Sequence, residues 1–577
     1  MNRTDRGVIA GLVLVLAFSA VAIGGPSRAT QPGAQPSDAP TESPPAPYRE
    51  GALGRPVSVS PLGARTQVDR DLVALVFEGL VKLDADGHPM PALASSWTSD
   101  AKGATWTFHL RPDARWQDDE PVTADDVVFT VDTLRNVDYH GPGAGSWLGI
   151  TATAVDARTV RFDLADPFAG FLELTAQPIA PKHLLGDTPV AGMAGDPFGA
   201  QPVGSGPYAV LELDRDHAVL RPAPAFTPPD VDEMGATPGT SNDPLAPSHP
   251  TPRPSSAQAG LARLEFRFYD TAAALTTAYR SGVVDAASGL SPLEAATLGT
   301  ESGSRLVRDP STNLVAVLLN LRPSHPEFRD PKVRYALLQA LDRTAILQAA
   351  FGGQASRADA FLPPSSWGFD AKASPELKQN ARAASKALSV AGWTQAKDGW
   401  RAPDAKAATV LELLVPNRTA NAALYAVGAQ VAADWKAIGL VTKIVEVDPA
   451  ILAADHLRTG GFAAAVVDIA LGHDPDLYPL LASSQTQTGG ANVMGLQDPL
   501  LDGLLEAARK PATDTVRKAA LVALQTRLTG GTYSLPIAWP DSVFVVRQKV
   551  IGPAVRTVSD GSERFWDVLT WRLAGDR

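Results

Sequence analysis

Segments of strand period alternate along this chain with segments of helical period, and this alternation narrows its possible folds more than any other feature. Residues 105–110 and 159–164 alternate apolar and polar side chains, which predicts two strands with one buried face. Residues 441–447, which follow a predicted helix, and the apolar run at residues 463–467 predict two further strands. Helical segments lie between these strands, so the sequence predicts an α/β architecture.

Four helices are predicted from apolar stripes of helical period with start and stop signals at their ends. Thr123 and Asp330 stand at N-cap positions, and Pro331 suits the first helical position. Glycine pairs at residues 352–353 and 530–531 are typical of helix C-termini. The four predicted helices cover residues 124–134, 331–351, 422–438 and 514–528.

The composition is that of a globular protein and excludes several kinds of site. The 577 residues suffice for about four domain-sized units. A formal net charge of -11 argues against a surface that follows phosphates, so we expect no nucleic-acid partner. The chain has no cysteine, which excludes disulfides, thiolate metal sites, cysteine nucleophiles and a lipid-modified cysteine anchor.

The N-terminus has the pattern of an export signal. Arg3 and Arg6 precede an uncharged apolar stretch over residues 8–23, which is near the lower limit for spanning a bilayer. Small residues at 20–22 and at 27–29 are compatible with cleavage, and a retained membrane anchor is the alternative. We therefore expect an extracytoplasmic protein, at the cell surface or in a periplasm, with residues 1–29 either cleaved or kept as a tether.

Two stretches rich in proline and small polar residues interrupt the periodic pattern. Residues 30–50 cannot bury much apolar area, which predicts a disordered linker. Residues 227–260 have a similar composition and separate two strand-like segments. We interpret this second stretch as a surface insertion within one domain, in preference to a domain boundary.

A search for catalytic and metal-binding motifs is negative. The sequence has no G-x-S-x-G, H-E-x-x-H or G-x-x-x-x-G-K motif. Residues 99–102 match S-x-x-K, but the companion S-D-N and K-T-G motifs are missing. The nine histidines lack metal-ligand spacing, and residues 84–87 indicate a hairpin turn. We expect no catalytic residue, no cofactor and no metal site.

Aspartates follow the predicted strand at residues 463–467. A carboxylate at a strand end that faces a cleft is well placed to hold a ligand ammonium group. Asp468 has this position, and a purely structural role is an equally open interpretation for it. For Asp474 and Asp476, which flank Pro475, roles in a turn or a helix cap are favoured.

Five ordered segments resemble the peptide/nickel-type (family 5) extracellular solute-binding proteins of ABC transporters, and in particular the dipeptide- and oligopeptide-binding members. The most specific match covers residues 106–128 and includes the run Pro-Val-Thr-Ala-Asp-Asp-Val-Val. Asp119 departs from the family pattern, in which glycine is usual. The other matching segments lie at residues 75–97, 202–208, 319–337 and 468–492.

The resemblance implies a periplasmic-binding-protein-like fold of type II, cluster C. Such a fold has two hinge-linked lobes and an extra inserted domain, and ligand is enclosed between domains I and III. The domains that the resemblance implies are a discontinuous domain I of residues 51–83, 178–268 and 536–577, a domain II of residues 84–177 and a domain III of residues 269–535.

The resemblance also implies a function without bond breaking. The protein is expected to act as a monomer that captures a small ligand, in the first place an oligopeptide, and delivers it to separate ABC permease subunits. In peptide-binding members an aspartate of the late segment holds the α-amino group, and Asp468 is nearest to that position. The remaining predicted ligand contacts are Asn320, Asn492, His473 and Tyr478.

Three other functions remain open at this stage. One is a binding protein of the same fold for another cargo, such as a nickel chelate or an oligosaccharide. Another is an anchored sensor protein that takes no part in transport. A secreted hydrolase is disfavoured, because the search for catalytic motifs finds none.

Overall fold

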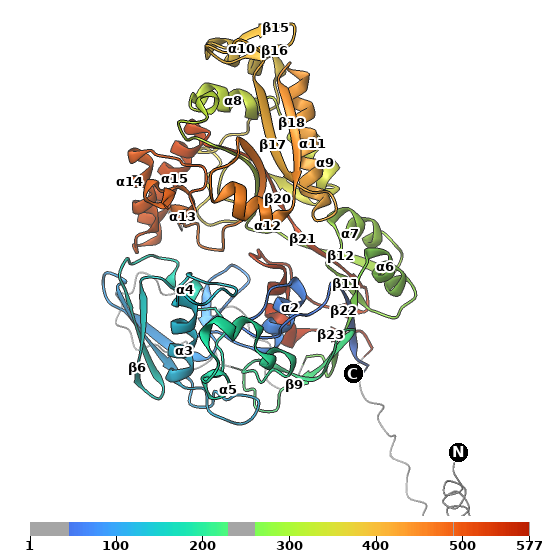
Figure 1. The fold of residues 1–577 in the computed structure, drawn as a ribbon. Helices are drawn as coiled ribbons and strands as arrows, with labels where there is room; N and C mark the ends of the chain where they lie inside the picture. Colours follow the sequence, from blue (N-terminus) through green and yellow to red (C-terminus); the bar gives the residue numbers. More distant parts are fainter. Residues whose placement is uncertain (1–45, 229–259, 488–489, 576–577) are drawn as a thin grey trace, which may run out of the picture. The chain divides into compact units, whose positions relative to one another are not determined.

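The computed structural model describes residues 46–228, 260–487 and 490–575, and it confirms the predicted α/β architecture. Its three larger sheets have seven, six and four strands (Figure 1). The export signal at residues 1–29 and most of the insertion at residues 227–260 lie outside the described residues. Within the described part of the chain, no helix combines the length and the apolarity that crossing a membrane requires.

The seven-stranded sheet collects segments from both ends of the chain. Its strand order is β12-β21-β11-β1-β10-β9-β8, and β1 runs parallel to both of its neighbours. The strands are β1 (Tyr48–Leu53), β8 (Tyr208–Leu213), β9 (His217–Pro222), β10 (Leu264–Tyr269), β11 (Ala286–Ser288), β12 (Ser304–Asp309) and β21 (Ser542–Arg547). The helices of this region are α2 (Gln67–Val76), α6 (Ala272–Arg280) and α7 (Pro292–Gly299).

Strand β1 corrects the predicted linker. The linker was expected to extend to residue 50, but Tyr48 and Glu50 are fully buried in the sheet. The Tyr48 hydroxyl donates a hydrogen bond to the Glu50 carboxylate (2.7 Å). Proline-rich composition identified the preceding residues, but it could not show that the parallel partner β10 lies more than 200 residues away. Strands β9 and β10 flank the insertion and pair with each other, as an insertion within one domain requires.

The four-stranded sheet is an antiparallel layer in the order β4-β5-β7-β6. Its strands are β4 (Ala94–Ser99), β5 (Thr105–Leu110), β6 (Ile150–Asp156) and β7 (Thr159–Leu164), so both strands predicted from alternation are confirmed. The predicted helix is α3 (Ala124–Arg135), where the Asp126 carboxylate accepts a hydrogen bond from the Thr123 amide (2.8 Å). Short helices α4 (Phe171–Leu174) and α5 (Lys182–Leu185) follow, and the hairpin of β2 (Val81–Leu83) and β3 (Pro89–Pro91) precedes.

The six-stranded sheet has the order β14-β20-β13-β19-β17-β18, and its central strand is buried on both faces. Along β13, Val315 and Val317 belong to one apolar cluster and Leu314 and Ala316 to another, because successive side chains point to opposite faces. The strands are β13 (Asn313–Leu319), β14 (Ala355–Arg357), β17 (Val410–Pro416), β18 (Val441–Val447), β19 (Ala464–Ala470) and β20 (Ser534–Pro540).

Helices cover this sheet and differ from the predictions in two places (Figure 1). The helix predicted over residues 331–351 is two helices, because Asp342 caps a new start by accepting a hydrogen bond from the Ala345 amide (2.9 Å). Both halves pack on one core, so the apolar stripe hides the break. The main helices are α8 (Pro331–Gln339), α9 (Arg343–Phe351), α10 (Ala381–Val390), α11 (Ala422–Ala437), α14 (Pro499–Arg509) and α15 (Asp514–Gly531).

The last of these helices ends later than its glycines predict. Gly530 and Gly531 are helical, and Thr532 instead takes the left-handed conformation (φ 43°) that ends α15. Helix α11 and strand β18 agree with the predicted ranges. Shorter elements complete the chain: α12 (Pro449–Ile451), α13 (Tyr478–Leu481), β15 (Thr394–Ala396), β16 (Gly399–Arg401), β22 (Val550–Ile551) and β23 (Arg572–Leu573).

The chain passes between the seven- and six-stranded sheets at two adjacent places. Residues 310–312 connect β12 to β13, and Asp541 alone connects β20 to β21. The Ser311 hydroxyl donates a hydrogen bond to the Pro540 carbonyl (2.5 Å), which ties the two connections together. Two short, neighbouring connections between two bodies are the arrangement that hinge closure requires.

These connections shift two of the predicted domain boundaries. The boundary at residue 269 would separate β11 and β12 from the seven-stranded sheet, in which both are hydrogen-bonded to β21. The boundary at residue 536 would cut β20 in the middle. Local periodicity finds strands but does not identify their distant partners, so it could not place either boundary.

Candidate ligand-binding cavity

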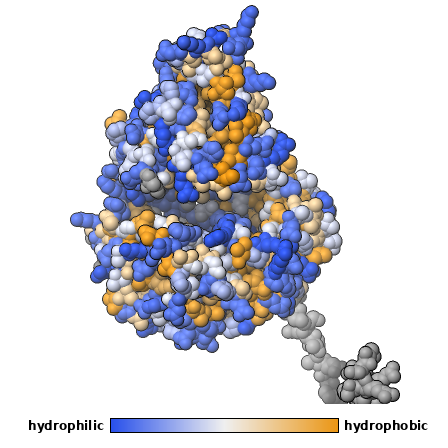
Figure 2. All heavy atoms as spheres, in the orientation of Figure 1, coloured by the Kyte–Doolittle hydropathy of each residue, from blue (hydrophilic) through white to orange (hydrophobic). Residues whose placement is uncertain are grey.

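A cavity of about 250 Å³ lies beside the two connections, with walls from both of the larger sheets. Figure 2 shows the surface hollowed between the elements of the six-stranded sheet and those of the other two sheets. The lining residues with polar side chains are Gln67, Asp71, Ser288, Ser311, Asn313, Asp468, Asp541, Ser542, Ser559, Asp560 and Arg564. A site with walls from both sides of a hinge can couple ligand contacts to closure.

Asp468 is the predicted site residue that lines this cavity. It lies inside β19, opposite Val315 of β13, and the strand continues to Ala470. The expected position at the strand end is therefore wrong by two residues. The side chain is exposed to the cavity, and among the described residues no side chain forms an ion pair or hydrogen bond with its carboxylate. Desolvation by the surrounding walls raises the pKa of Asp468 to about 6.

The other carboxylates of the cavity wall each have an arginine partner. Asp71 lies 2.7 Å from Arg564, measured from nitrogen to oxygen. The corresponding distances are 2.6 Å between Asp541 and Arg308 and 2.7 Å between Asp560 and Arg70. Asp541 and Asp560 each have their own arginine, and Asp71 shares Arg564 with Glu50, whereas Asp468 has no cationic partner among the described residues.

Arg564 lies between two buried carboxylates and is the cation of the cavity wall. Its Nη1 donates to Asp71 (2.7 Å), and its Nη2 donates to Glu50 (2.6 Å) and to Asp71 (2.8 Å). Desolvation raises the pKa of Asp71, and the Arg564 charge opposes that rise. Replacing Arg564 would leave two buried carboxylates without a cation, so this triad holds N-terminal and C-terminal segments of the described chain together.

Asn313 is a cavity residue that the sequence did not indicate. It begins β13, on the strand next to Asp468, and its side-chain oxygen Oδ1 is buried without a hydrogen-bond partner among the described residues. A buried amide oxygen without a partner is suited to accept a hydrogen bond from a ligand. No motif marks this asparagine, and only its place at the start of a buried strand could have suggested it.

Asn320 and Asn492 have structural roles, which corrects the ligand contacts predicted for them. The Asn320 amide nitrogen donates to the carbonyls of Gly460 (2.9 Å) and Phe462 (2.7 Å). The Asn492 amide nitrogen donates to three carbonyl oxygens, and its Oδ1 accepts from the Leu496 amide (3.1 Å). Both side chains are buried and hold loops in place.

His473 and Tyr478 also lie away from the lining of the cavity. His473 Nε2 is 2.8 Å from Glu563 Oε2, and its ring rests against Gly87, where an added Cβ would lie 3.2 Å from Nδ1. The Tyr478 hydroxyl is 3.0 Å from the Ser484 hydroxyl, and the Arg509 guanidinium stacks over its ring. Of the five predicted ligand residues, the structure therefore brings Asp468 alone to the cavity.

Asp474 links the loop after β19 to helix α4, away from the connections at residues 310–312 and Asp541. Its carboxylate accepts two hydrogen bonds from Arg517 of α15 (3.0 and 2.8 Å), and its amide donates to the Glu173 carboxylate of α4 (2.5 Å). Desolvation and then the Asp474 charge raise the pKa of Glu173 well above its usual value. The turn role expected for Asp474 is thus replaced by an ion pair, while Asp476 accepts from the Tyr478 amide (3.0 Å) as a turn residue does.

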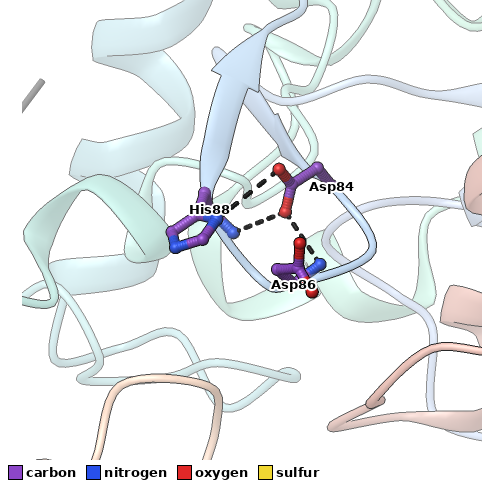
Figure 3. Close-up of side chains that lie close together, drawn as sticks. All are labelled: Asp84, Asp86 and His88. Carbon is purple, nitrogen blue, oxygen red and sulfur yellow. Dashed lines mark hydrogen bonds and ion pairs between the residues drawn. The ribbon is translucent and has the colours of Figure 1, made fainter. Parts of the chain in front are cut away.

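Asp84, Asp86 and His88 have side-chain ligand atoms within 4.8 Å of one another (Figure 3). The Asp84 carboxylate accepts hydrogen bonds from the backbone amides of Asp86 and His88, each at 2.9 Å. These contacts form the predicted hairpin turn between β2 and β3, in which Gly87 has a positive φ of 84°. The turn accounts for the proximity of the three side chains, and we assign them no metal.

Comparisons with known proteins agree on one family. Residues 88–492 match the bacterial extracellular solute-binding proteins, family 5 Middle. Protein XP55 of Streptomyces lividans is 28% identical over 100% of this chain and 94% of its own length. The oligopeptide-binding protein AppA of Bacillus subtilis is 24% identical over 80% of each chain. The glutathione-binding protein GsiB of Salmonella typhi is 26% identical over 56% of this chain and 59% of its own.

Solved structures confirm the predicted two-lobed, periplasmic-binding-protein-like fold. CtaP from Listeria monocytogenes has a TM-score of 0.73 at 22% identity and covers 92% of this chain and 99% of its own. AppA from Bacillus subtilis, solved with a nonapeptide, has a TM-score of 0.70 at 20% identity with the same coverage. The matched segment is more than half of the sequence, and the resemblance found in the motifs is confirmed. The chain belongs to family 5 of the bacterial extracellular solute-binding proteins.

Proposed function

We propose that this solute-binding protein captures a peptide by its amino terminus and delivers it to an ABC permease. The observation that carries the peptide assignment is the unpaired Asp468 carboxylate in a cavity between two hinged sheets. A carboxylate without a cationic partner inside a cavity is complementary to an ammonium group. The relatives AppA and GsiB, whose names give oligopeptide and glutathione as ligands, support a peptide as cargo.

Capture in this proposal depends on closure of the two sheets around the ligand. Residues 310–312 and Asp541 serve as the hinge, and ligand contacts on both walls favour the closed state. Asn313 accepts a hydrogen bond from the ligand on the same wall as Asp468. No step breaks a covalent bond, which agrees with a family and a fold of binding proteins.

Delivery to a permease requires a binding protein outside the cytoplasm, and the family consists of extracellular proteins. We propose that residues 1–29 direct export and then either are cleaved or keep the protein at the membrane surface. The permease and its ATPase are separate chains in this proposal, and the binding protein acts as a monomer.

The test is a ligand screen by thermal shift, followed by calorimetry on the purified protein. Pools of di- to hexapeptides are compared with oligosaccharides and nickel chelates, because a ligand at a hundredfold excess over its Kd stabilises the native state by about 2.7 kcal/mol. Asp468→Asn is compared with Asp187→Asn, which changes an exposed aspartate outside the cavity. We expect peptide binding that Asp468→Asn weakens and Asp187→Asn leaves unchanged.

Other outcomes discriminate the remaining functions. Stabilisation by sugars or chelates alone would retain the transport role and reject the peptide. A folded protein that no compound stabilises, and that carries no co-purified ligand in native mass spectrometry, would favour the anchored sensor.

A further inference from the structure

The charges of the cavity wall indicate which end of a ligand it holds, an inference that rests on the proposed function. We propose that the cavity admits a cationic group of the ligand and rejects a carboxylate. A bound peptide then has a carboxyl terminus that is either capped or located outside the cavity.

The first argument is that the cationic side chain of the described cavity lining is already paired with carboxylates of the protein. Arg564 is the charged cationic side chain of the lining, and three of its hydrogen bonds go to the carboxylates of Glu50 and Asp71. Its Nη1 also donates to the Gly561 carbonyl (2.8 Å), and its Nε is buried without a hydrogen-bond partner among the described residues. The single positive charge of Arg564 is already shared by two carboxylates, so no side chain of the described lining has a net positive charge to offer a ligand carboxylate.

The second argument is the sign of the uncompensated charge. Asp71, Asp541 and Asp560 each contact an arginine, which Asp71 shares with Glu50, and among the described lining residues Asp468 is the carboxylate that meets a ligand without a cation. A ligand carboxylate in this cavity would lose its hydration and face Asp468 without a partner. Juxtaposed like charges are a strong element of discrimination against a wrong ligand.

The third argument is size. A volume of about 250 Å³ is below the roughly 300–1,000 Å³ of most small-molecule sites, so the cavity holds only one end of a longer peptide. In a dipeptide the carboxyl group is close to the ammonium and falls inside the cavity. In a hexapeptide it lies far enough along the chain to remain outside.

The decisive measurement is the ratio of affinities for peptides that differ only at the carboxyl terminus. Calorimetry is done with Ala-Phe as free acid and as amide, and with a hexapeptide in the same two forms. We expect the dipeptide amide to bind at least about tenfold more tightly than the acid, because like charges at close range cost at least as much as that ratio. The two hexapeptides should agree within about twofold. Glutathione, with two carboxylates and one ammonium, should bind more weakly than the dipeptide amide.

A dipeptide acid that binds as tightly as its amide would overturn this inference while leaving peptide capture intact. A folded protein that binds none of the four peptides would instead overturn the proposed function. These two failures are therefore distinguishable in one series of titrations.

A variant with a new cation tests the same inference in the opposite direction. Ser542 is half-buried in the cavity wall, and Ser542→Lys supplies the missing partner for a carboxylate. The acid-to-amide ratio for the dipeptide should shift toward the acid by about tenfold. Ser542→Met has similar bulk without charge and should keep the original ratio. An unchanged ratio in a folded Ser542→Lys protein would contradict the inference, and the acid–amide ratio of the unaltered protein decides it if the variant does not fold.

Discussion

Strand β19 and the loop that follows it carry two aspartates six residues apart, in opposite environments. Asp468 in the strand is exposed to the cavity and has no cationic partner among the described residues. Asp474 in the loop is enclosed by Arg517 of α15 and Glu173 of α4. The first carboxylate is free to meet a ligand, and the second holds parts of the protein together. Residue type and local position are nearly the same, so the difference comes from cations supplied by distant segments.

Removing the cation that pairs with Asp474 should have the largest effect, and the quantity that changes is the stability of the protein. Arg517→Met leaves Glu173 and Asp474 as two adjacent carboxylates without their cation. We expect the free energy of unfolding to fall by about 3–5 kcal/mol, the usual cost of breaking a buried pair. Chemical denaturation measures the change, with Arg382→Met at an exposed site as control. A loss below about 1 kcal/mol would show that this contact is solvated and weak.

Removing the Asp468 carboxylate should weaken ligand binding and leave the stability of the free protein intact. Asp468→Asn takes away an ionic hydrogen bond to the ligand, which is worth about 1.5–3 kcal/mol, and the Kd should rise about 10- to 100-fold. The melting temperature of the free protein should stay the same or rise, since an unpaired, partly desolvated charge is removed. A lower melting temperature with unchanged Kd would exchange the roles assigned to Asp468 and Asp474.

Acidification should weaken binding through Asp468. Its folded-state pKa is about 6, and a ligand ammonium stabilises the ionised form. Binding affinity is therefore complete above pH 6 and falls as pH drops through that value, by up to about tenfold per unit of pH. Titrations at pH 7.5 and pH 5 measure this slope. The slope should vanish in Asp468→Asn, and a slope that persists there would assign it to Glu173 or Asp474 at the other contact.

The smallest effect is expected at Glu173. Burial beside Asp474 raises its pKa, so the charged form is penalised in the folded state and stability falls as pH rises past the unfolded value. Glu173→Gln keeps an oxygen that can accept from the Asp474 amide and removes the like charge. We expect a gain of about 1 kcal/mol at pH 7.5 that disappears at pH 4. Denaturation at the two pH values tests this, and equal stability changes at both would contradict it.

Local pattern was sufficient for much of the secondary structure. Strands β5 and β7 have the predicted bounds because each alternates apolar and polar side chains over its whole length. Helix α3 begins after Thr123 because the capping signal lies within four residues of the start. The sequence alone therefore predicts an element where its signal, alternation or capping, involves residues that are close together in the chain.

The candidate site shows the limit of this approach. Motif position predicted a ligand contact for Asp468, but it predicted the same for Asn320 and Asn492. The side-chain amides of these two asparagines donate hydrogen bonds to backbone carbonyls of the protein. Asn313 carries no motif, and its place in the cavity follows from the pairing of β13 with β19. Nothing near Asp541 in sequence shows that it pairs with Arg308.

The amino-acid sequence was thus enough for the family, the α/β class and most strands and helices, since these depend on contacts between near neighbours and on ordered motifs. The tertiary structure was needed to show that β1 pairs with β10, that the two larger sheets are connected at residues 310–312 and Asp541, and which carboxylates have an arginine partner. Strand partners and ion pairs join residues hundreds of positions apart. Their energies depend on distance in space and on desolvation, and neither quantity is a function of position along the chain.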